Sequence, residues 1–152
     1  MTTPVAASTL EALRPTLIAT PVRRAMQLGF VECAPETDLA AIARTLADRR
    51  VHCLVVRPAG TRGARGRWRL VSDKDVLRAL YRGDACNSAG ELATEDVIGV
   101  HPGDPLLRAA ELMDEHGAAH VLVLSPTTNR PVGIVSSLDL VRVAGELATI
   151  AA

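Results

Sequence analysis

Two serine–aspartate pairs in this chain have the residue types and the spacing to bind a sugar and a phosphate. Asp139 follows Ser136 by three residues, and Asp75 follows Ser72 in the same way. A serine in front of a helix, with an acid at the third helical position, forms a capping box at a helix end that attracts anions. A carboxylate one turn into the helix can accept hydrogen bonds from a ribose diol. Taken alone, each pair is better explained as a helix cap.

The elements that must position these pairs are also duplicated. Residues 132–135 and 68–71 are short apolar segments that end at the two serines. Their β-branched and apolar residues favour buried strands, and apolar residues at helical spacing follow each pair. The sequence therefore predicts that Ser136 and Ser72 each lie where a strand turns into a helix.

The duplication extends over most of the chain. Four upstream residues recur 67 positions later: Pro35, Leu39, Ala43 and Leu46 as Pro102, Leu106, Ala110 and Met113. His52 aligns with His120 at an offset of 68, and Ser72 with Ser136 at 64. Each copy is too short to bury an adequate core alone, so we expect the two copies to pack on each other.

Each repeat is predicted to have the order β-α-β-β-α. The strands are expected at 30–33, 51–56 and 68–71 and again at 97–100, 120–124 and 132–135; the helices are expected at 38–50, 73–81, from Asp104 onwards and at 137–147. The predicted segments are an N-terminal helix within 1–19, repeats at 20–82 and 93–147, a linker at 83–92 and a tail at 148–152.

Composition excludes several classes of protein. The 152 residues carry 17 basic and 17 acidic side chains, and only one Phe, one Trp and one Tyr. A nucleic-acid binder usually has a basic excess, and a single-strand binder needs stacking aromatics. The chain shows no membrane-length apolar run or signal peptide, and its three cysteines have no CxxC spacing. We expect a reduced, soluble, cytoplasmic protein.

Residues 57–69 form the most basic stretch, with five arginines, three glycines and no acid. This composition fits either a phosphate or nucleic-acid contact or a solvated hairpin loop. The loop is favoured, because aromatic residues are not interleaved among the arginines from 57 to 67 and the chain has no basic excess.

Together these features resemble a tandem pair of CBS domains, the module named after cystathionine β-synthase. The resemblance covers roughly Thr20 to Gly145, and the motif Gly-hydrophobic-x-Ser/Thr-x-x-Asp is complete in residues 133–139. Val100-His101-Pro102 and the following Gly103-Asp104 fit the family's lead-in. The resemblance implies an α/β (α+β) fold in which two β-α-β-β-α repeats pack as a pseudo-two-fold pair.

In this family, adenosine-containing ligands bind in clefts between the repeats, where the serine contacts phosphate and the aspartate holds the ribose hydroxyls. By resemblance, one site contains Gly133, Ile134, Ser136 and Asp139, with Phe30 and Val31 lining the adenine. The other contains Ser72 and Asp75, with Val97 and Ile98 lining the adenine. His52 and His120 are either phosphate-facing residues or core histidines.

The first motif departs from the family pattern, because Arg69 stands where the second has Gly133. A glycine permits close backbone approach, which an arginine prevents. Arg69 could instead reach a phosphate or block the cleft. The Ser136 site is therefore predicted to be the stronger of the two.

The resulting prediction is a regulatory module that binds an adenosine nucleotide, senses energy or metabolite state, and acts on a separate effector protein. The expected ligand is AMP, ADP, ATP or another adenosyl compound, with no obligatory cofactor. No catalytic or metal-ligand set is visible, so an enzyme is not expected. Two alternatives are a ligand-free interaction or dimerisation module and a nucleic-acid-binding protein that uses residues 57–69.

A homodimer is also predicted, because the helices carry more apolar surface than one pair of repeats can cover. The residues in question are Ala40, Ala47, Leu77, Leu80, Leu112, Leu140 and Val143.

Overall fold

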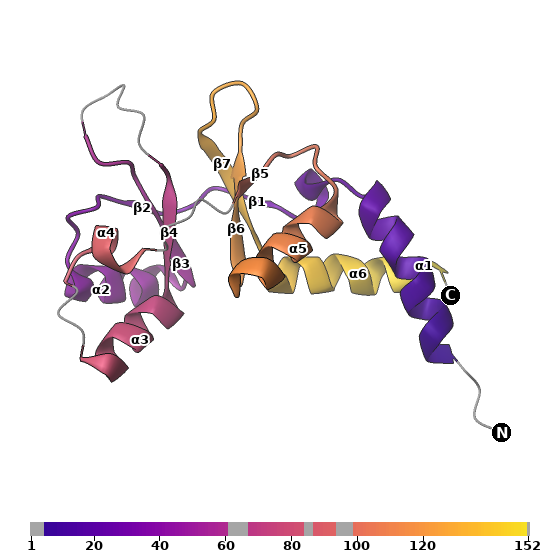
Figure 1. The fold of residues 1–152 in the computed structure, drawn as a ribbon, viewed down its shortest axis with the longest axis horizontal. Helices are drawn as coiled ribbons and strands as arrows, with labels where there is room; N and C mark the ends of the chain where they lie inside the picture. The colour runs from indigo at the N-terminus through magenta and orange to yellow at the C-terminus, as the bar shows by residue number, and fades with distance from the viewer. Residues whose placement is uncertain (1–4, 61–66, 84–86, 94–98, 152) are drawn as a thin grey trace. The chain divides into compact units, whose positions relative to one another are not determined.

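A computed structural model describes residues 5–60, 67–83, 87–93 and 99–151 of the chain (Figure 1). The chain forms two compact units. We call Met1–Gly29 together with Ile98–Ala152 the terminal unit, and Phe30–Val97 the central unit.

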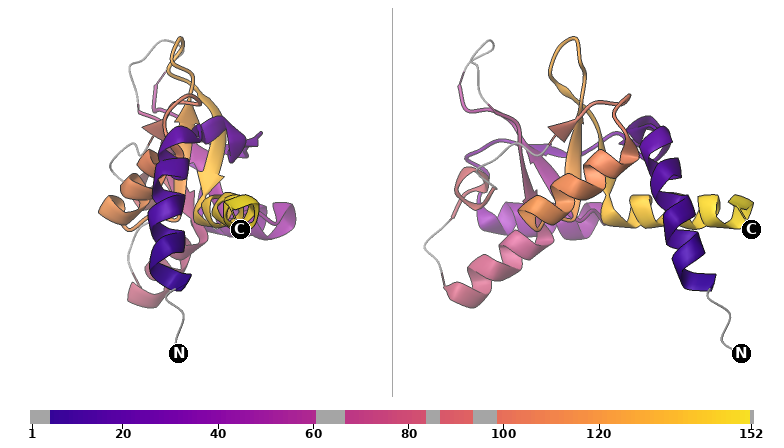
Figure 2. Two further views of the ribbon diagram at one scale, coloured as in Figure 1. Left: turned by 90° about the vertical axis from the view of Figure 1, so that its right-hand side faces the viewer. Right: turned by 45° about the vertical axis from the view of Figure 1, so that its right-hand side comes forward.

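The terminal unit has a four-stranded sheet in the order β1-β7-β6-β5, in which only the β5–β6 pair is parallel. Helix α1 lies against α5 and α6 (Figure 2). In the core of this unit, valines of the sheet pack against α5. These valines face the same side of the sheet because alternate residues along β6 and β7 point in the same direction. The elements in chain order are α1 (Val5–Ala19), the 3-10 helix η1 (Val22–Arg24), β1 (Gln27–Leu28), β5 (Gly99–Val100), α5 (Leu106–His116), β6 (His120–Leu124), β7 (Pro131–Ser136) and α6 (Ser137–Ala151).

The central unit repeats this plan with a three-stranded sheet in the order β2-β3-β4. Strand β2 pairs in parallel with β3, and β4 is antiparallel to it. Ile42 and Leu46 of α2 pack with Leu54 and Val56 of β3 in a separate core. The elements are β2 (Glu32–Cys33), α2 (Leu39–Arg49), β3 (Cys53–Val56), β4 (Arg69–Ser72), α3 (Asp73–Arg82) and α4 (Ala89–Leu92).

The predicted mixed α/β class and the β-α-β-β-α order of both repeats are confirmed. The first strand of the first repeat is shorter than predicted, so Phe30 and Val31 precede β2. Asp104 is not the N-cap of α5: Pro105 holds that position, and a carboxylate oxygen of Asp104 accepts from the His101 N–H at 2.8 Å.

The segment that precedes the first strand of each repeat packs with the other repeat. The Leu106 N–H donates to the Thr20 carbonyl at 2.7 Å, and the equivalent Leu39 N–H donates to Asn87 at 3.0 Å. As a result η1 and β1 belong to the terminal unit and α4 to the central unit. Elements of two to four residues are too short for hydrophobic periodicity to reveal, which explains why α4 falls within the predicted linker.

Strand register corrects the alignment of the two histidines. Ser72 pairs with Cys53 on β3, whereas Ser136 pairs with His120 on β6. The second strands are therefore related by 67 residues, like the helices before them, and His52 corresponds to Ala119. The prediction that His52 and His120 are equivalent is wrong, because the length difference lies wholly in the hairpin after these strands.

Equivalent helices end on different residues in the same conformation. Arg50 closes α2 with φ 53°, and Gly117 closes α5 with φ 57°. The left-handed region costs a residue with a Cβ about 1–2 kcal/mol, which glycine avoids.

Arg50→Gly should therefore raise the free energy of unfolding by about 1 kcal/mol. Gly117→Ala, the matched control, should lower it by a similar amount. Urea unfolding monitored by circular dichroism measures both changes. A loss of stability in Arg50→Gly would show that the arginine side chain contributes more than its backbone strain costs.

Candidate functional site

The turn between β7 and α6 holds Ser136 and Asp139 in a reciprocal capping box. One carboxylate oxygen of Asp139, Oδ2, accepts from the Ser136 backbone N–H at 2.9 Å and from its hydroxyl at 2.7 Å. The Ser136 hydroxyl oxygen accepts from the Asp139 N–H at 3.1 Å. Ser136 and Asp139, two residues of one predicted ligand site, thus lie together and hydrogen-bond to each other.

The other carboxylate oxygen of Asp139 is also engaged. Oδ1 accepts from the Gln27 side-chain amide at 3.0 Å and lies 3.4 Å from the Arg142 guanidinium. Asp139 is only 2% exposed. Burial opposes ionisation, but the hydrogen bonds from Ser136 and Gln27 and the charge of Arg142 outweigh it and lower the pKa of Asp139. The site therefore holds a buried, ionised carboxylate.

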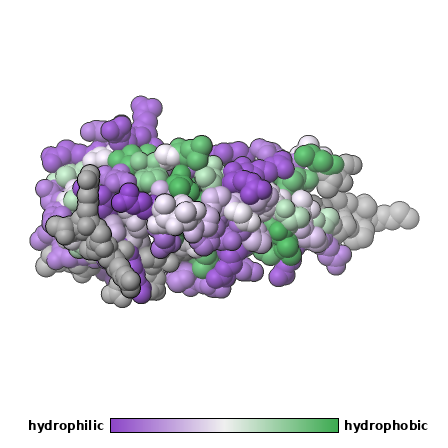
Figure 3. Space-filling model, turned by 90° about the horizontal axis from the view of Figure 1, so that it is seen from above, coloured by the Kyte–Doolittle hydropathy of each residue, from purple (hydrophilic) through white to green (hydrophobic). Residues whose placement is uncertain are grey.

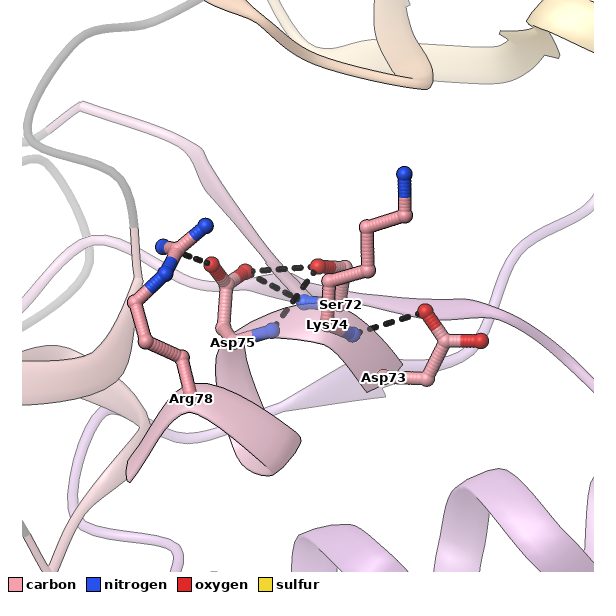
Figure 4. A network of polar contacts seen from close by, with 5 residues as sticks. All are labelled: Ser72, Asp73, Lys74, Asp75 and Arg78. Carbon is pink, nitrogen blue, oxygen red and sulfur yellow. Dashed lines mark hydrogen bonds and ion pairs between the residues drawn. The ribbon is translucent and has the colours of Figure 1, made fainter. Parts of the chain in front are cut away.

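The turn between β4 and α3 repeats this arrangement (Figure 4). Oδ2 of Asp75 accepts from the Ser72 N–H and hydroxyl, both at 2.8 Å, and the Ser72 hydroxyl accepts from the Asp75 N–H at 3.3 Å. Oδ1 of Asp75 is paired with Arg78 at 3.3 Å. The Asp75 side chain is 11% exposed, so this carboxylate is the more open of the two.

Two further charged residues, Asp73 and Lys74, lie at the first turn. Asp73 bonds the ring of His52 at 2.9 Å, with the His52 side chain 76% exposed. The Lys74 side chain extends away from the helix with its ammonium group clear of the other labelled residues (Figure 4). In the second turn the positions of Asp73 and Lys74 are occupied by Ser137 and Leu138. The first turn therefore carries more charge than the second.

The first N–H groups of these helices are largely bonded within the protein. The Asp73 N–H donates to the His52 carbonyl at 2.9 Å, and the Ser137 N–H donates to Ala119 at 2.9 Å. The Lys74 N–H donates to the Asp73 carboxylate at 2.8 Å. The expectation of open helix N–H groups for an anion is thus wrong for these donors, and cationic side chains are better placed to meet a phosphate.

Gly133 is explained by the approach of a neighbouring strand. Leu28 of β1 pairs with Gly133, and Gln27 pairs with Ile134. A Cβ added to Gly133 would lie 2.5 Å from the Gln27 carbonyl oxygen, closer than real contacts allow. The glycine of the motif therefore admits β1 to the sheet and so sets the Gln27 amide beside Asp139.

His120 lies beside the second turn. It pairs directly with Ser136 across β6 and β7, so both side chains are on the same face of the sheet. His52 lacks this relation to Ser72, because it precedes β3 and bonds Asp73 instead.

Arg69 is anchored within the central unit. Its guanidinium donates to the Gly90 carbonyl of α4 at 2.9 Å. This contact ties β4 to α4, and the ranking of the Ser136 site above the Ser72 site stays a prediction.

The structure describes two of the four residues predicted to line the adenine. Phe30 and Val31 are half-buried in the central unit, where the Val31 carbonyl accepts from the Val55 N–H at 2.9 Å. They and Ser136 belong to different units, so their joint site stays a prediction. Val97 and Ile98 lie outside the described residues, as do residues 61–66 of the arginine-rich tract.

Four residues beside the carboxylates were missed by the sequence reasoning: Gln27, Lys74, Arg78 and Arg142. The two arginines each follow an aspartate of the motif by three residues, so this repetition could have revealed them. No comparable signal marks Gln27, because its partner is 112 residues away in the sequence.

The two described cysteines are unsuited to nucleophilic chemistry. Cys33 and Cys53 are buried and free, in β2 and β3 as predicted. Burial, with smaller effects of Asp73 and Asp75, raises the pKa of Cys53 to about 12, so its thiol is protonated at neutral pH. Cys86 lies outside the described residues.

The described part of the chain has neither a metal-binding cluster nor a membrane-spanning helix. Among those residues, no group of three or more His, Cys, Asp or Glu side chains is arranged to hold a metal ion. No described helix has both the length and the apolar character needed to cross a membrane.

Comparison with known proteins identifies the fold. Residues 89–146 match the family model described as CBS domain. The CBS domain pair of protein MJ0100, in complex with 5'-methylthioadenosine and S-adenosyl-L-methionine, has a TM-score of 0.69 at 22% identity, over 82% of this chain and 98% of that chain. No match was found among curated proteins.

Two other solved structures are somewhat closer in sequence. The CBS domain protein PAE2072 from Pyrobaculum aerophilum, complexed with AMP, has a TM-score of 0.69 at 29% identity, over 86% of this chain and 99% of that chain. Hypoxic Response Protein I with two coordinated zinc ions has a TM-score of 0.64 at 28% identity, over 81% and 98%. The duplicated strand–serine–helix turns, the family match over residues 89–146 and these structures agree: the chain has the fold of a CBS domain pair.

Proposed function

We propose that this protein is a regulatory module that binds an adenosine-containing compound at its Ser-x-x-Asp turns and acts on a separate effector protein. The observation that carries the proposal is the duplicated arrangement itself: Asp139 and Asp75 are held in the same geometry beside Ser136 and Ser72. A carboxylate fixed in this way can accept hydrogen bonds from a sugar diol. The AMP complex of PAE2072, at 29% identity, supports this ligand class.

The charges around the first turn favour a phosphorylated ligand there. Lys74 and Arg78 flank Asp75: the Lys74 ammonium is clear of the other labelled residues, and Arg78, although paired with Asp75, has further N–H donors to offer a phosphate next to the ribose. We propose AMP, ADP, ATP or another adenosyl compound as the ligand, with no obligatory cofactor.

Ligand binding should stabilise the folded protein. A compound that binds only the native state adds about 2.7 kcal/mol at one hundred times its dissociation constant. For a chain of this size that corresponds to a rise of several degrees in melting temperature. A thermal-shift series with AMP, ADP, ATP, S-adenosylmethionine and methylthioadenosine checks this, with the matching guanosine nucleotides as controls. The proposal fails if no adenosine compound at millimolar concentration changes the transition.

A ligand-free interaction module is the second candidate, and one observation favours it. Both oxygens of Asp139 are satisfied within the protein, and its side chain is almost inaccessible. A domain that had lost ligand binding would keep such a closed cap for stability alone. Under this alternative, the protein would bind its effector equally well with and without adenosine compounds.

We also propose a homodimer formed through exposed apolar residues of α3 and α6. Leu77, Leu80 and Tyr81 of α3 are 64%, 63% and 91% exposed, and Leu138 and Val141 of α6 are 65% and 66% exposed. The face seen from above in Figure 3 also has apolar groups set among hydrophilic side chains. A two-fold partner would cover such residues by pairing like helices.

The residues expected to supply this surface are partly different from those predicted. Val143 is only 5% exposed and belongs to the terminal unit's core, against which Leu112 and Leu140 are also packed. Leu77 and Leu80 are exposed as predicted, and so are Ala40 and Ala47.

Light scattering coupled to size-exclusion chromatography should give about twice the chain mass of 16.1 kDa. Leu77→Glu with Leu80→Glu should return the mass to that of one chain, because two buried charges oppose an apolar interface. Leu28→Glu, at an exposed position outside these helices, is the matched control. A single-chain mass for the unaltered protein at micromolar concentration contradicts the dimer.

A further inference from the structure

The Gln27 side chain occupies a position that a ligand would need. Gln27 lies on the two-residue strand β1, which pairs with β7 at the sheet edge next to the Ser136 turn. Its amide donates to Oδ1 of Asp139 at 3.0 Å. Oδ2 of the same carboxylate is already used by Ser136. Oδ1 is therefore the oxygen left for a ribose hydroxyl, and an internal donor holds it.

The first turn differs at this point. Oδ1 of Asp75 is paired with Arg78, as Oδ1 of Asp139 is paired with Arg142, but no glutamine from a described strand reaches it. The Asp75 side chain is correspondingly more exposed, at 11% against 2% for Asp139. The two carboxylates thus share a cap and a cation and differ in the amide that covers one of them.

The covering residue is poorly anchored on its own strand. Gln27 and Leu28 are both exposed, and β1 is paired on one side only, at the edge of the sheet. The amide can therefore leave Asp139 without disturbing the core behind β7, which is formed by Val121, Val123 and Val135.

We infer that Gln27 is an internal competitor for the ribose-binding carboxylate Asp139, so that a ligand at the second turn binds only when the Gln27 amide is displaced. This inference rests on the proposed function. It makes the Ser136 site weaker than its residues alone would imply, and it couples occupancy of that site to the position of β1 and the segment before it. Gln27 thus distinguishes the two sites in addition to the exchange of Gly133 for Arg69.

The test uses AMP and 2'-deoxy-AMP with the full chain carrying Asp75→Asn, so that the second turn reports alone. Gln27→Ala should tighten AMP binding by about tenfold, the factor that corresponds to one hydrogen bond to a charged group. Binding of 2'-deoxy-AMP should tighten less, because this analogue lacks one of the two hydroxyls that compete with the amide. Leu28→Ala, the neighbouring exposed residue of β1, is the control for loosening of the strand and should leave both affinities unchanged.

Calorimetric titration distinguishes the outcomes. Unchanged or weaker AMP binding in Gln27→Ala, while the Asp75→Asn parent binds AMP, overturns the competitor role and leaves the proposed function standing. Equal tightening in Gln27→Ala and Leu28→Ala also overturns it, because the strand and not the amide would then be responsible. If neither the unaltered protein nor any variant binds AMP or any other adenosine compound of the thermal-shift series, the proposed function fails and the inference fails with it. Circular dichroism spectra matching the parent confirm that each variant is folded.

Discussion

Asp139→Ala should lower the free energy of unfolding by about 2–4 kcal/mol. The substitution removes the acceptor for the Ser136 N–H and hydroxyl and for the Gln27 amide, and it leaves Arg142 without its partner. Loss of a helix cap costs about 1 kcal/mol, and hydrogen bonds to a charged group contribute about 1.5–3 kcal/mol. Urea unfolding of the purified variant measures the change.

Asp75→Ala is the matched control and should cost less, about 1–2 kcal/mol. Its capping box has the same geometry, but the side chain is more exposed and lacks the glutamine contact. Equal losses in the two variants would mean that Gln27 and the deeper burial of Asp139 contribute nothing to stability.

The contribution of Asp139 should also depend on pH in one direction. Its pKa is lower in the folded protein than the ordinary value of about 3.9, so the native state favours the ionised form. The stabilisation is fully present above the unfolded-state pKa and is lost as the pH falls through the folded-state pKa. The difference in unfolding free energy between the parent and Asp139→Asn should therefore be constant from pH 6 to 8 and shrink below about pH 4. A difference that grows on acidification would contradict this assignment.

Gly133→Ala should destabilise the protein by about 1–3 kcal/mol, the usual cost of forcing extra atoms into a packed site. The new methyl group would lie 2.5 Å from the Gln27 carbonyl oxygen, so β1 must move away from β7. Because β1 carries the amide that contacts Asp139, the variant should also lose that hydrogen bond.

Gly145→Ala gives the opposite expectation within the same unit. Gly145 lies inside α6, and a Cβ there meets nothing within 4 Å. Alanine is favoured over glycine in a helix interior by about 1 kcal/mol, so this variant should be more stable than the parent. Destabilisation by both substitutions would show that the effect at Gly133 is not specific to the approach of β1.

The regular part of this fold could be predicted from the sequence because its signals are local. Apolar spacing in 39–49 and 106–116 identifies two helices, and the β-branched segments before Ser72 and Ser136 identify the strands that deliver the turns. The capping boxes were predictable for the same reason, since all their atoms lie within four consecutive residues.

The remainder depends on contacts between distant segments. The β1–β7 pairing joins residues more than one hundred positions apart, and η1, β1 and α4 are too short to have a periodic pattern. The two histidines differ in role because their strand positions differ by one residue. Neighbouring positions on a strand face opposite sides of the sheet, so His120 shares a face with Ser136, whereas His52 bonds Asp73. Hydrophobic patterning could not distinguish offsets of 67 and 68, because all residues of β3 are apolar.

Calorimetric titration of the protein with AMP, with and without its two motif carboxylates, tests the central claim most directly. The double variant Asp75→Asn with Asp139→Asn keeps the serine N-caps Ser72 and Ser136, and an amide oxygen accepts a hydroxyl less strongly than a carboxylate does, so circular dichroism spectra matching the parent would separate binding from folding. We expect saturable binding of AMP to the unaltered protein and at least tenfold weaker binding to the double variant, since hydrogen bonds to the two charged groups are lost. Equal affinity in both proteins, or no saturable binding of AMP, ADP, ATP, S-adenosylmethionine or methylthioadenosine to the unaltered protein, would contradict the claim that the Ser-x-x-Asp turns bind adenosine compounds.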